Sequence, residues 1–180
     1  MVESSNTDIE RLIETCGFDD FGRCAASCLE VREEVRDMCA AGRCGQYGKS
    51  WACPPACGSL QDYQELISQR SHCYVIQTVE KLEDEFDVEA MMHAEQVQKA
   101  RVFQLVDLLA EHGIDALVLT SGTCTVCPEC SYPDAPCRFP DKRLVSMEAA
   151  GLVVGDVCIA CETSYNHGKG TIAYTSCVLL

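Results

Sequence analysis

The sequence lacks any apolar run that approaches the roughly 20 residues needed to span a bilayer. Its first ten residues are polar and acidic, without the basic and apolar stretches of a secretory signal peptide. Basic residues are also scarce, because 14 Lys and Arg stand against 28 Asp and Glu, for a net charge of -14. Such a charge repels nucleic acid and anionic membranes. These absences predict a cytoplasmic protein that binds neither nucleic acid nor membrane.

Motifs of several common enzyme classes are absent as well. There is no glycine-rich phosphate loop, no Ser-His-Asp order and no radical-type Cys-x3-Cys-x2-Cys. The spacing of the histidines is not that of metal ligands, and they are predicted to be surface or capping residues: His72, His93, His112 and His167. The sequence therefore leaves open whether the protein is an enzyme.

Cysteine is abundant, with 15 residues among 180. The count is odd, and many cysteines are separated by only two or three residues, where neighbours rarely have disulfide geometry. In the cytoplasm such thiols stay reduced. Reduced thiols in clusters usually hold metal, so the sequence predicts a metal-binding protein.

Length and hydrophobic patterning indicate a single α/β domain over residues 1–180. Apolar periodicity predicts helices over 7–15, 24–39 and 87–112, and another that starts near residue 60 after a Ser59-x-x-Asp62 capping box. Residues 73–79, 114–120 and 171–180 are predicted strands. We expect a small mixed sheet of three or more strands, flanking helices and two cysteine-rich metal-binding loops.

The strand–helix–strand order of residues 73–120 predicts a parallel pair joined by a right-handed crossover. A short helix is expected around Ser146 to Ala149.

The strongest local signal is Cys124-x2-Cys127-x2-Cys130-x6-Cys137. Three cysteines at three-residue steps curl a loop around one centre, which is typical of the start of a [4Fe–4S] binding loop. Four cysteines also suit tetrahedral zinc, but zinc ribbons usually separate two Cys-x2-Cys pairs by a longer span. Iron–sulfur is therefore favoured, with zinc as the alternative. The cations that follow, Arg138, Lys142 and Arg143, are either partners of an anionic site or surface groups.

A looser pattern, Cys39-x4-Cys44-x8-Cys53-x3-Cys57, is a candidate second site. Trp51 is expected to wall it from water, and the N-terminus of the helix near residue 60 would favour an anionic group. The alternative is that some of these cysteines are plain buried thiols.

Residues 44–55 (CGQYGKSWACPP), the segment 124–149 and residues 171–176 (TIAYTS) together resemble a prokaryotic family of unknown function described as "predicted metal-binding protein". The resemblance covers residues 39–180, so that 1–38 is expected to be an N-terminal helical extension. It implies cysteine-bound metal, iron–sulfur first, in mainly anaerobic organisms, and it implies no agreed reaction.

Seven cysteines stay outside both patterns. Cys158 and Cys161 are a possible redox dithiol, or could join Cys24 and Cys28 as a third site, but buried thiols are the favoured interpretation. The isolated cysteines are predicted core residues: Cys16, Cys73 and Cys177.

The function predicted is an iron–sulfur protein with one or two [4Fe–4S] clusters that exchanges electrons with a redox partner protein. Two alternatives stay open. One is a cluster-dependent enzyme with a labile iron, and the other is a zinc-stabilised interaction module. The sequence indicates neither the partner nor the oligomeric state.

Overall fold

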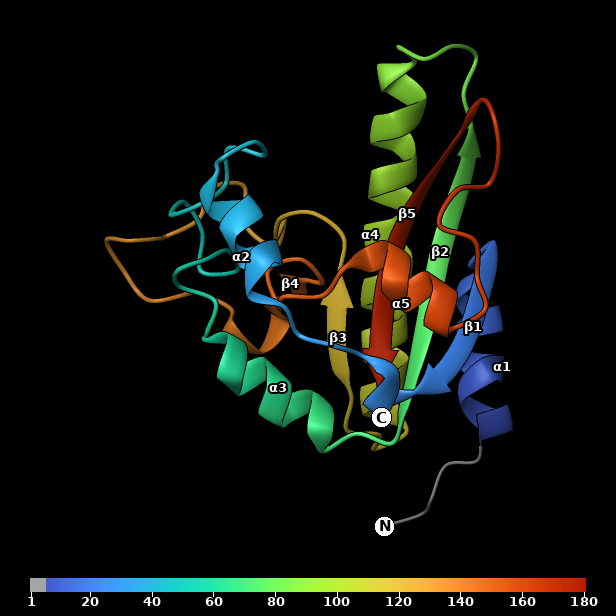
Figure 1. The fold of residues 1–180 in the computed structure, drawn as a ribbon, viewed down its shortest axis with the longest axis horizontal. Helices are drawn as coiled ribbons and strands as arrows, with labels where there is room; N and C mark the ends of the chain where they lie inside the picture. Colours follow the sequence, from blue (N-terminus) through green and yellow to red (C-terminus); the bar gives the residue numbers. More distant parts are fainter. Residues whose placement is uncertain (1–5) are drawn as a thin grey trace.

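Residues 6–180 are described by the computed structural model, and their strands form one mixed sheet in the order β1-β2-β5-β3-β4 (Figure 1). The strands are β1 (Asp20–Ala25), β2 (His72–Lys81), β3 (Leu117–Thr120), β4 (Val145–Ser146) and β5 (Thr171–Leu179). β2 pairs antiparallel with β1 and β5, β5 pairs antiparallel with β3, and β3 with β4 is the parallel pair.

The strict alternation of side chains along β2 divides the core into two halves, because successive residues of a strand point to opposite faces. Tyr74 and Ile76 face one side, whereas Cys73 and Val75 face the other, and all four are fully buried. A sheet with two apolar faces needs cover on both, so the chain forms an α/β/α sandwich.

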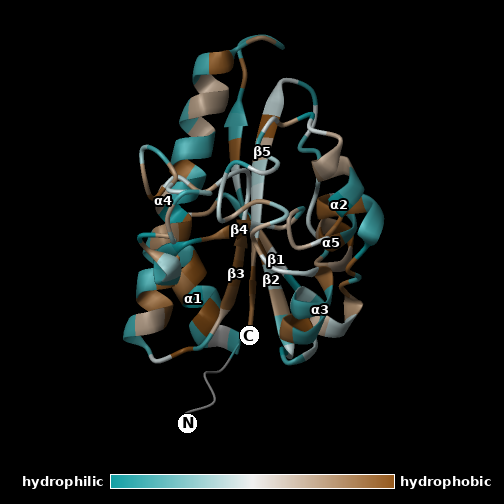
Figure 2. Cartoon of the chain, turned by 90° about the vertical axis from the view of Figure 1, so that its left-hand side faces the viewer, coloured by the Kyte–Doolittle hydropathy of each residue, from teal (hydrophilic) through white to brown (hydrophobic). Residues whose placement is uncertain are grey.

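One face is covered by α1 (Asn6–Cys16) and α4 (Val88–Glu111) (Figure 2). Ile9 and Ile13 from α1 and Leu105 from α4 pack with Tyr74 and Ile76. Gly113 follows α4 at a φ of 66°, the left-handed conformation in which a glycine commonly ends a helix.

The other face is covered by α2 (Glu33–Ala40), α3 (Leu60–Ser68), α5 (Val154–Ala160) and the 3-10 turn η1 (Ala26–Cys28) (Figures 1 and 2). A second 3-10 turn, η2 (Pro140–Lys142), lies between β3 and β4. α3 begins with the predicted capping box, in which the Ser59 hydroxyl accepts from the Asp62 N–H and the Asp62 carboxylate accepts from the Ser59 N–H.

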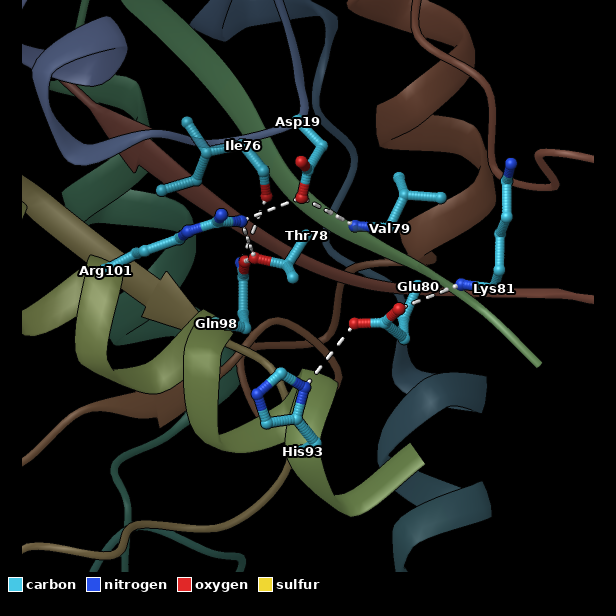
Figure 3. A network of polar contacts seen from close by, with 9 residues as sticks. All are labelled: Asp19, Ile76, Thr78, Val79, Glu80, Lys81, His93, Gln98 and Arg101. Carbon is cyan, nitrogen blue, oxygen red and sulfur yellow. Dashed lines mark hydrogen bonds and ion pairs between the residues drawn. The ribbon is translucent and has the colours of Figure 1, made fainter. Parts of the chain in front are cut away.

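A buried polar network joins α4 to the sheet (Figure 3). The Gln98 side chain accepts from the Thr78 hydroxyl at 2.7 Å and donates to the Ile76 carbonyl at 3.2 Å and the Ser176 hydroxyl at 2.9 Å. Arg101 donates to Thr78 as well. Buried polar groups need such partners, so this network sets the position of α4 along β2 and β5.

The α/β class with a small mixed sheet is confirmed, but three details of the prediction are wrong. The predicted helix over 24–39 is instead the end of β1, η1, a connection and α2. The strands around 73–79 and 117–120 do run parallel, but β5 lies between them and pairs with both. Residues 147–150 form a turn after β4 in place of a short helix.

Among residues 6–180, no helix combines the length with the apolar character that crossing a bilayer requires.

Candidate metal centre

The two cysteine-rich loops lie side by side at the edge of the sheet beyond β3 and β4 (Figure 1). Trp51 from the first loop joins them, because its indole N–H donates to the Ala135 carbonyl at 2.9 Å. Its ring also packs edge-on against Tyr132, with centroids 5.0 Å apart. Residues more than 80 positions apart therefore build one compact region.

All four cysteines of the second loop line a single cavity of about 440 Å³. They are Cys124, Cys127, Cys130 and Cys137. The loop leaves β3 after Thr120 and returns to β4 at Val145, so the two parallel strands hold its ends together. Trp51 lines this cavity, whereas the sequence had suggested it as a wall of the other site.

The cavity has groups that stabilise an anion. Burial raises the pKa of Cys130, but hydrogen bonds from the backbone N–H groups of Trp51 and Tyr132, with the Ser50 hydroxyl and the Arg138 charge, lower it overall. Arg138 and Arg143 line the cavity, while Lys142 does not. Within residues 6–180 the buried Nε of Arg143 has no hydrogen-bond partner. That N–H is closed off from the cavity, so the contribution of Arg143 to the cavity is the positive charge of its guanidinium.

Three cysteines of the first pattern line a neighbouring cavity of about 320 Å³: Cys39 from the end of α2, and Cys44 and Cys53 from the loop that follows. Gln46 and Thr123 lie on the boundary of both cavities. The Thr123 hydroxyl is 3.7 Å from the Cys53 sulfur and directly precedes Cys124 in the chain. The two cavities therefore share a wall.

Cys57, the fourth cysteine of the first pattern, does not line that cavity. It is only 4% exposed, and its thiol faces the Ala149 carbonyl at 3.9 Å. Its own carbonyl accepts from the Tyr63 hydroxyl at 2.7 Å, which ties it to α3. Glu148 lines the cavity instead. The pKa of Cys39 is raised mainly by burial, next by the charge of Cys44 and then by the charge of Glu148.

Burial also raises the pKa of Cys53 and Cys57. A buried thiol of this kind becomes a thiolate when a cation replaces its proton, because the positive charge offsets the loss of solvation. The first cavity therefore suits a metal centre better than a free thiolate.

Outside both cavities the structure brings together Cys24, Cys73 and Cys161, whose sulfur atoms all lie within 4.8 Å of one another. The pKa of Cys24 falls to about 6, since hydrogen bonding from Cys73 outweighs burial and Cys161 adds to it. The sequence offered Cys24 and Cys161 only as part of a possible third site with Cys28 and Cys158, and no spacing connects Cys73 with them. Cys24 and Cys73 are in different strands, and the strand that carries Cys24 was itself missed.

A family model described as "Predicted metal-binding protein (DUF2284)" matches residues 23–180. The chain belongs to this family. The expected family membership is thus confirmed. The matched region contains both cysteine loops and the second half of β1, from Arg23 to Ala25. A search of curated proteins gave no match.

Among solved structures, the chain of this DUF2284 protein is similar to epoxyqueuosine reductase from Bacillus subtilis, at 10% identity and a TM-score of 0.46. A selenomethionine-labelled epoxyqueuosine reductase gives 9% and 0.46, and one with an epoxyqueuosine-modified tRNA stem loop gives 11% and 0.42. Each comparison covers 96% of this chain and 44% of the other. The chain therefore spans less than half the length of these proteins.

Proposed function

We propose that this protein binds one or two [4Fe–4S] clusters and exchanges electrons with a partner protein. The observation that carries the proposal is the single cavity lined by Cys124, Cys127, Cys130 and Cys137, with two arginines in its wall.

Cysteine-only coordination suits both zinc and iron–sulfur clusters. A single zinc ion draws its sulfurs to about 4 Å from one another, because each Zn–S bond is about 2.3 Å. Among the residues that the structure describes, the one group of three or more potential ligands within 4.8 Å of one another is Cys24, Cys73 and Cys161. The seven cysteines that line the two cavities surround larger spaces, and this supports clusters over single zinc ions.

In the second loop, Cys124, Cys127, Cys130 and Cys137 would hold a cluster through their thiolates. When bound, such a cluster supplies one-electron reduction and oxidation. The chain itself contributes hydrogen-bond donors and positive charge, from the N–H groups around Cys130 and from Arg138 and Arg143. These donors and charges stabilise a negatively charged group in the cavity, and they stabilise it more as its negative charge increases.

The first cavity supports a second centre close to the first. Cys39, Cys44 and Cys53 would be its thiolates, and the Thr123 hydroxyl of the second loop lies 3.7 Å from the Cys53 sulfur. Adjacent centres that share a wall favour transfer of an electron from one to the other.

A cluster-dependent enzyme is the second candidate, and one observation favours it. The first cavity has three cysteines in its wall while Cys57 is packed in the core. A cluster with three thiolates leaves one iron open to a small molecule. Cys57→Ser decides this point, since retention of all iron supports the open site, and loss of about half of the iron in a two-cluster protein makes Cys57 a ligand.

We further propose that the redox partner presents a basic face, because the chain carries a net charge of -14. Association of such a pair weakens as salt screens the charges.

The test of electron transfer is anaerobic reduction of the iron-loaded protein by dithionite, followed by EPR spectroscopy and reoxidation. The proposal predicts a signal of a reduced cluster that appears and disappears reversibly. It also predicts that Cys127→Ser removes that signal if one cluster is present and weakens it if there are two, whereas Cys28→Ser, at an exposed cysteine outside both cavities, retains it. A protein with iron but without any reversible redox signal would contradict electron transfer.

A further inference from the structure

A third group of thiols lies on the sheet face opposite α4. Cys24 of β1 and Cys73 of β2 are directly opposite each other in the antiparallel ladder, which places their side chains close together. Cys161, at the C-terminal end of α5, brings its sulfur to 3.2 Å from that of Cys24. Three elements far apart in the sequence thus direct sulfur atoms to one point.

The backbone permits this approach at Gly22. A side chain there would collide with the carbonyl oxygen of Cys161 and the methyl group of Thr163. Glycine weakens a strand interior, and its presence in one often marks a close approach of another backbone segment. The turn after α5 is further closed by the Thr163 N–H, which donates to the Cys158 carbonyl at 3.0 Å. The position of Cys161 is therefore set by backbone packing against β1.

The site is enclosed but reachable. Cys73 is 0% exposed and Cys161 is 1% exposed, whereas Cys24 is half-buried and opens the group to solvent. A buried cysteine that serves only as a small hydrophobe needs no sulfur neighbours. A disulfide uses two sulfurs, so it would leave the third without a role.

We propose that Cys24, Cys73 and Cys161 form a third metal site, which binds one thiophilic ion, Cu(I) or Zn²⁺. Both ions take thiolate ligands readily. With metal–sulfur bonds of about 2.3 Å, the sulfurs around one ion lie about 4 Å apart, and the three are already within 4.8 Å. Three sulfurs complete the coordination of Cu(I). Zn²⁺ prefers four, and Cys177, whose thiol influences that of Cys73 but lies outside the 4.8 Å group, would have to move closer to supply another.

The test is an anaerobic titration of the protein as purified, with Cu(I) or Zn²⁺ delivered from a competing colorimetric chelator. We expect the wild type to withdraw one equivalent more than Cys24→Ser, while Cys28→Ser matches the wild type. Cys28 is the matched control because it is an exposed cysteine in the adjacent turn. Iron content should not change during the titration, which separates this site from the two cavities.

A second readout needs no substitution. One equivalent of the ion should protect Cys24 from alkylation and leave Cys28 reactive, as read by peptide mass spectrometry. Loss of uptake in Cys177→Ser for Zn²⁺ alone would assign the four-sulfur form to zinc and the three-sulfur form to Cu(I). Equal uptake by the wild type and Cys24→Ser with no protection of Cys24, or release of iron as the ion enters, would overturn the proposal.

Discussion

At the scale of single residues, Arg143 contributes positive charge to the wall of the larger cavity. It lines the cavity of the second loop, and its buried Nε has no hydrogen-bond partner within residues 6–180. A buried donor without a partner is costly, and it becomes favourable when an acceptor lies beside it. That N–H is closed off from the cavity, but the guanidinium still places a positive charge in the cavity wall, which favours an anionic cluster there.

We predict that Arg143→Leu makes the reduction potential of the iron-loaded protein more negative. Reduction adds negative charge, and the variant removes a positive charge that stabilises the reduced form. Redox titration followed by EPR measures the shift. Lys142→Leu is the control, since Lys142 is exposed and does not line the cavity. An equal shift in both variants would mean that the protein's overall charge, and not a local contact, sets the potential.

The sequence allowed the second loop to be predicted better than the first. Cys124, Cys127, Cys130 and Cys137 lie within 14 residues, so local spacing alone brings them to one cavity. Cys57 was grouped with the first site by spacing too, but its direction depends on packing against Ala149, 92 residues away. Whether any of the eight cysteines binds metal stays a prediction.

At the scale of elements, α3 is a case in which local chemistry decided the structure. Its capping box was predicted from Ser59 and Asp62 and is present. We predict that Ser59→Ala lowers the free energy of unfolding by about 1 kcal/mol, because the Asp62 N–H loses its acceptor. Ser68→Ala, in the exposed last turn of the same helix, should cost less, and chemical denaturation of the iron-loaded protein measures both.

The same box predicts a pH dependence. The backbone N–H of Ser59, followed by its side chain, lowers the pKa of Asp62. A carboxyl group whose pKa is lower in the folded state stabilises the fold at every pH above its ordinary, unfolded-state pKa. This stabilisation is lost as the pH falls through the folded-state pKa. Denaturation of Asp62→Asn should therefore differ from wild type at neutral pH and converge with it in acid; a constant difference would contradict the assignment.

The network around Gln98 (Figure 3) predicts a larger effect. Gln98→Met keeps the side-chain volume but leaves the Thr78 and Ser176 hydroxyls and the Ile76 carbonyl without this partner. We expect a loss of about 1–3 kcal/mol in stability. Gln96→Met, exposed on the same helix, is the matched control and should be nearly neutral. Similar losses in the two variants would contradict the importance of the network.

The helices and strands with clear periodicity were predicted, whereas the order of the strands was not. α4 and β2 carry their own signals in apolar spacing and β-branched residues. The insertion of β5 between β2 and β3 depends on pairing across about 60 to 100 residues, which no local pattern records. β1 was missed because its residues are partly exposed and do not alternate clearly, and its last two residues were included in the helix predicted over 24–39.

At the scale of the whole molecule, a rigid sandwich holds two adjacent loops that have little regular structure of their own. Between β3 and β4 the chain contains only the short η2 turn. Loops of this kind have few backbone hydrogen bonds, so bound metal is expected to supply much of their order. Ligand binding to the folded state also raises stability.

We predict that iron removal makes this loop sensitive to trypsin at Arg138, Lys142 and Arg143, while Arg101 within α4 stays protected. Mass spectrometry of timed digests of the loaded and chelated proteins checks the prediction. Identical digestion in both states would show that the loop is ordered without metal.

The central claim is that the two cysteine loops hold iron–sulfur clusters. The most direct measurement is elemental analysis of anaerobically purified protein for iron, acid-labile sulfide and zinc. The account predicts iron and sulfide in equal amounts, about four or about eight of each per chain, with most of the iron lost in Cys127→Ser if one cluster is present and about half if there are two. Zinc at one or two ions per chain, with negligible iron, would contradict the account and make the loops zinc sites.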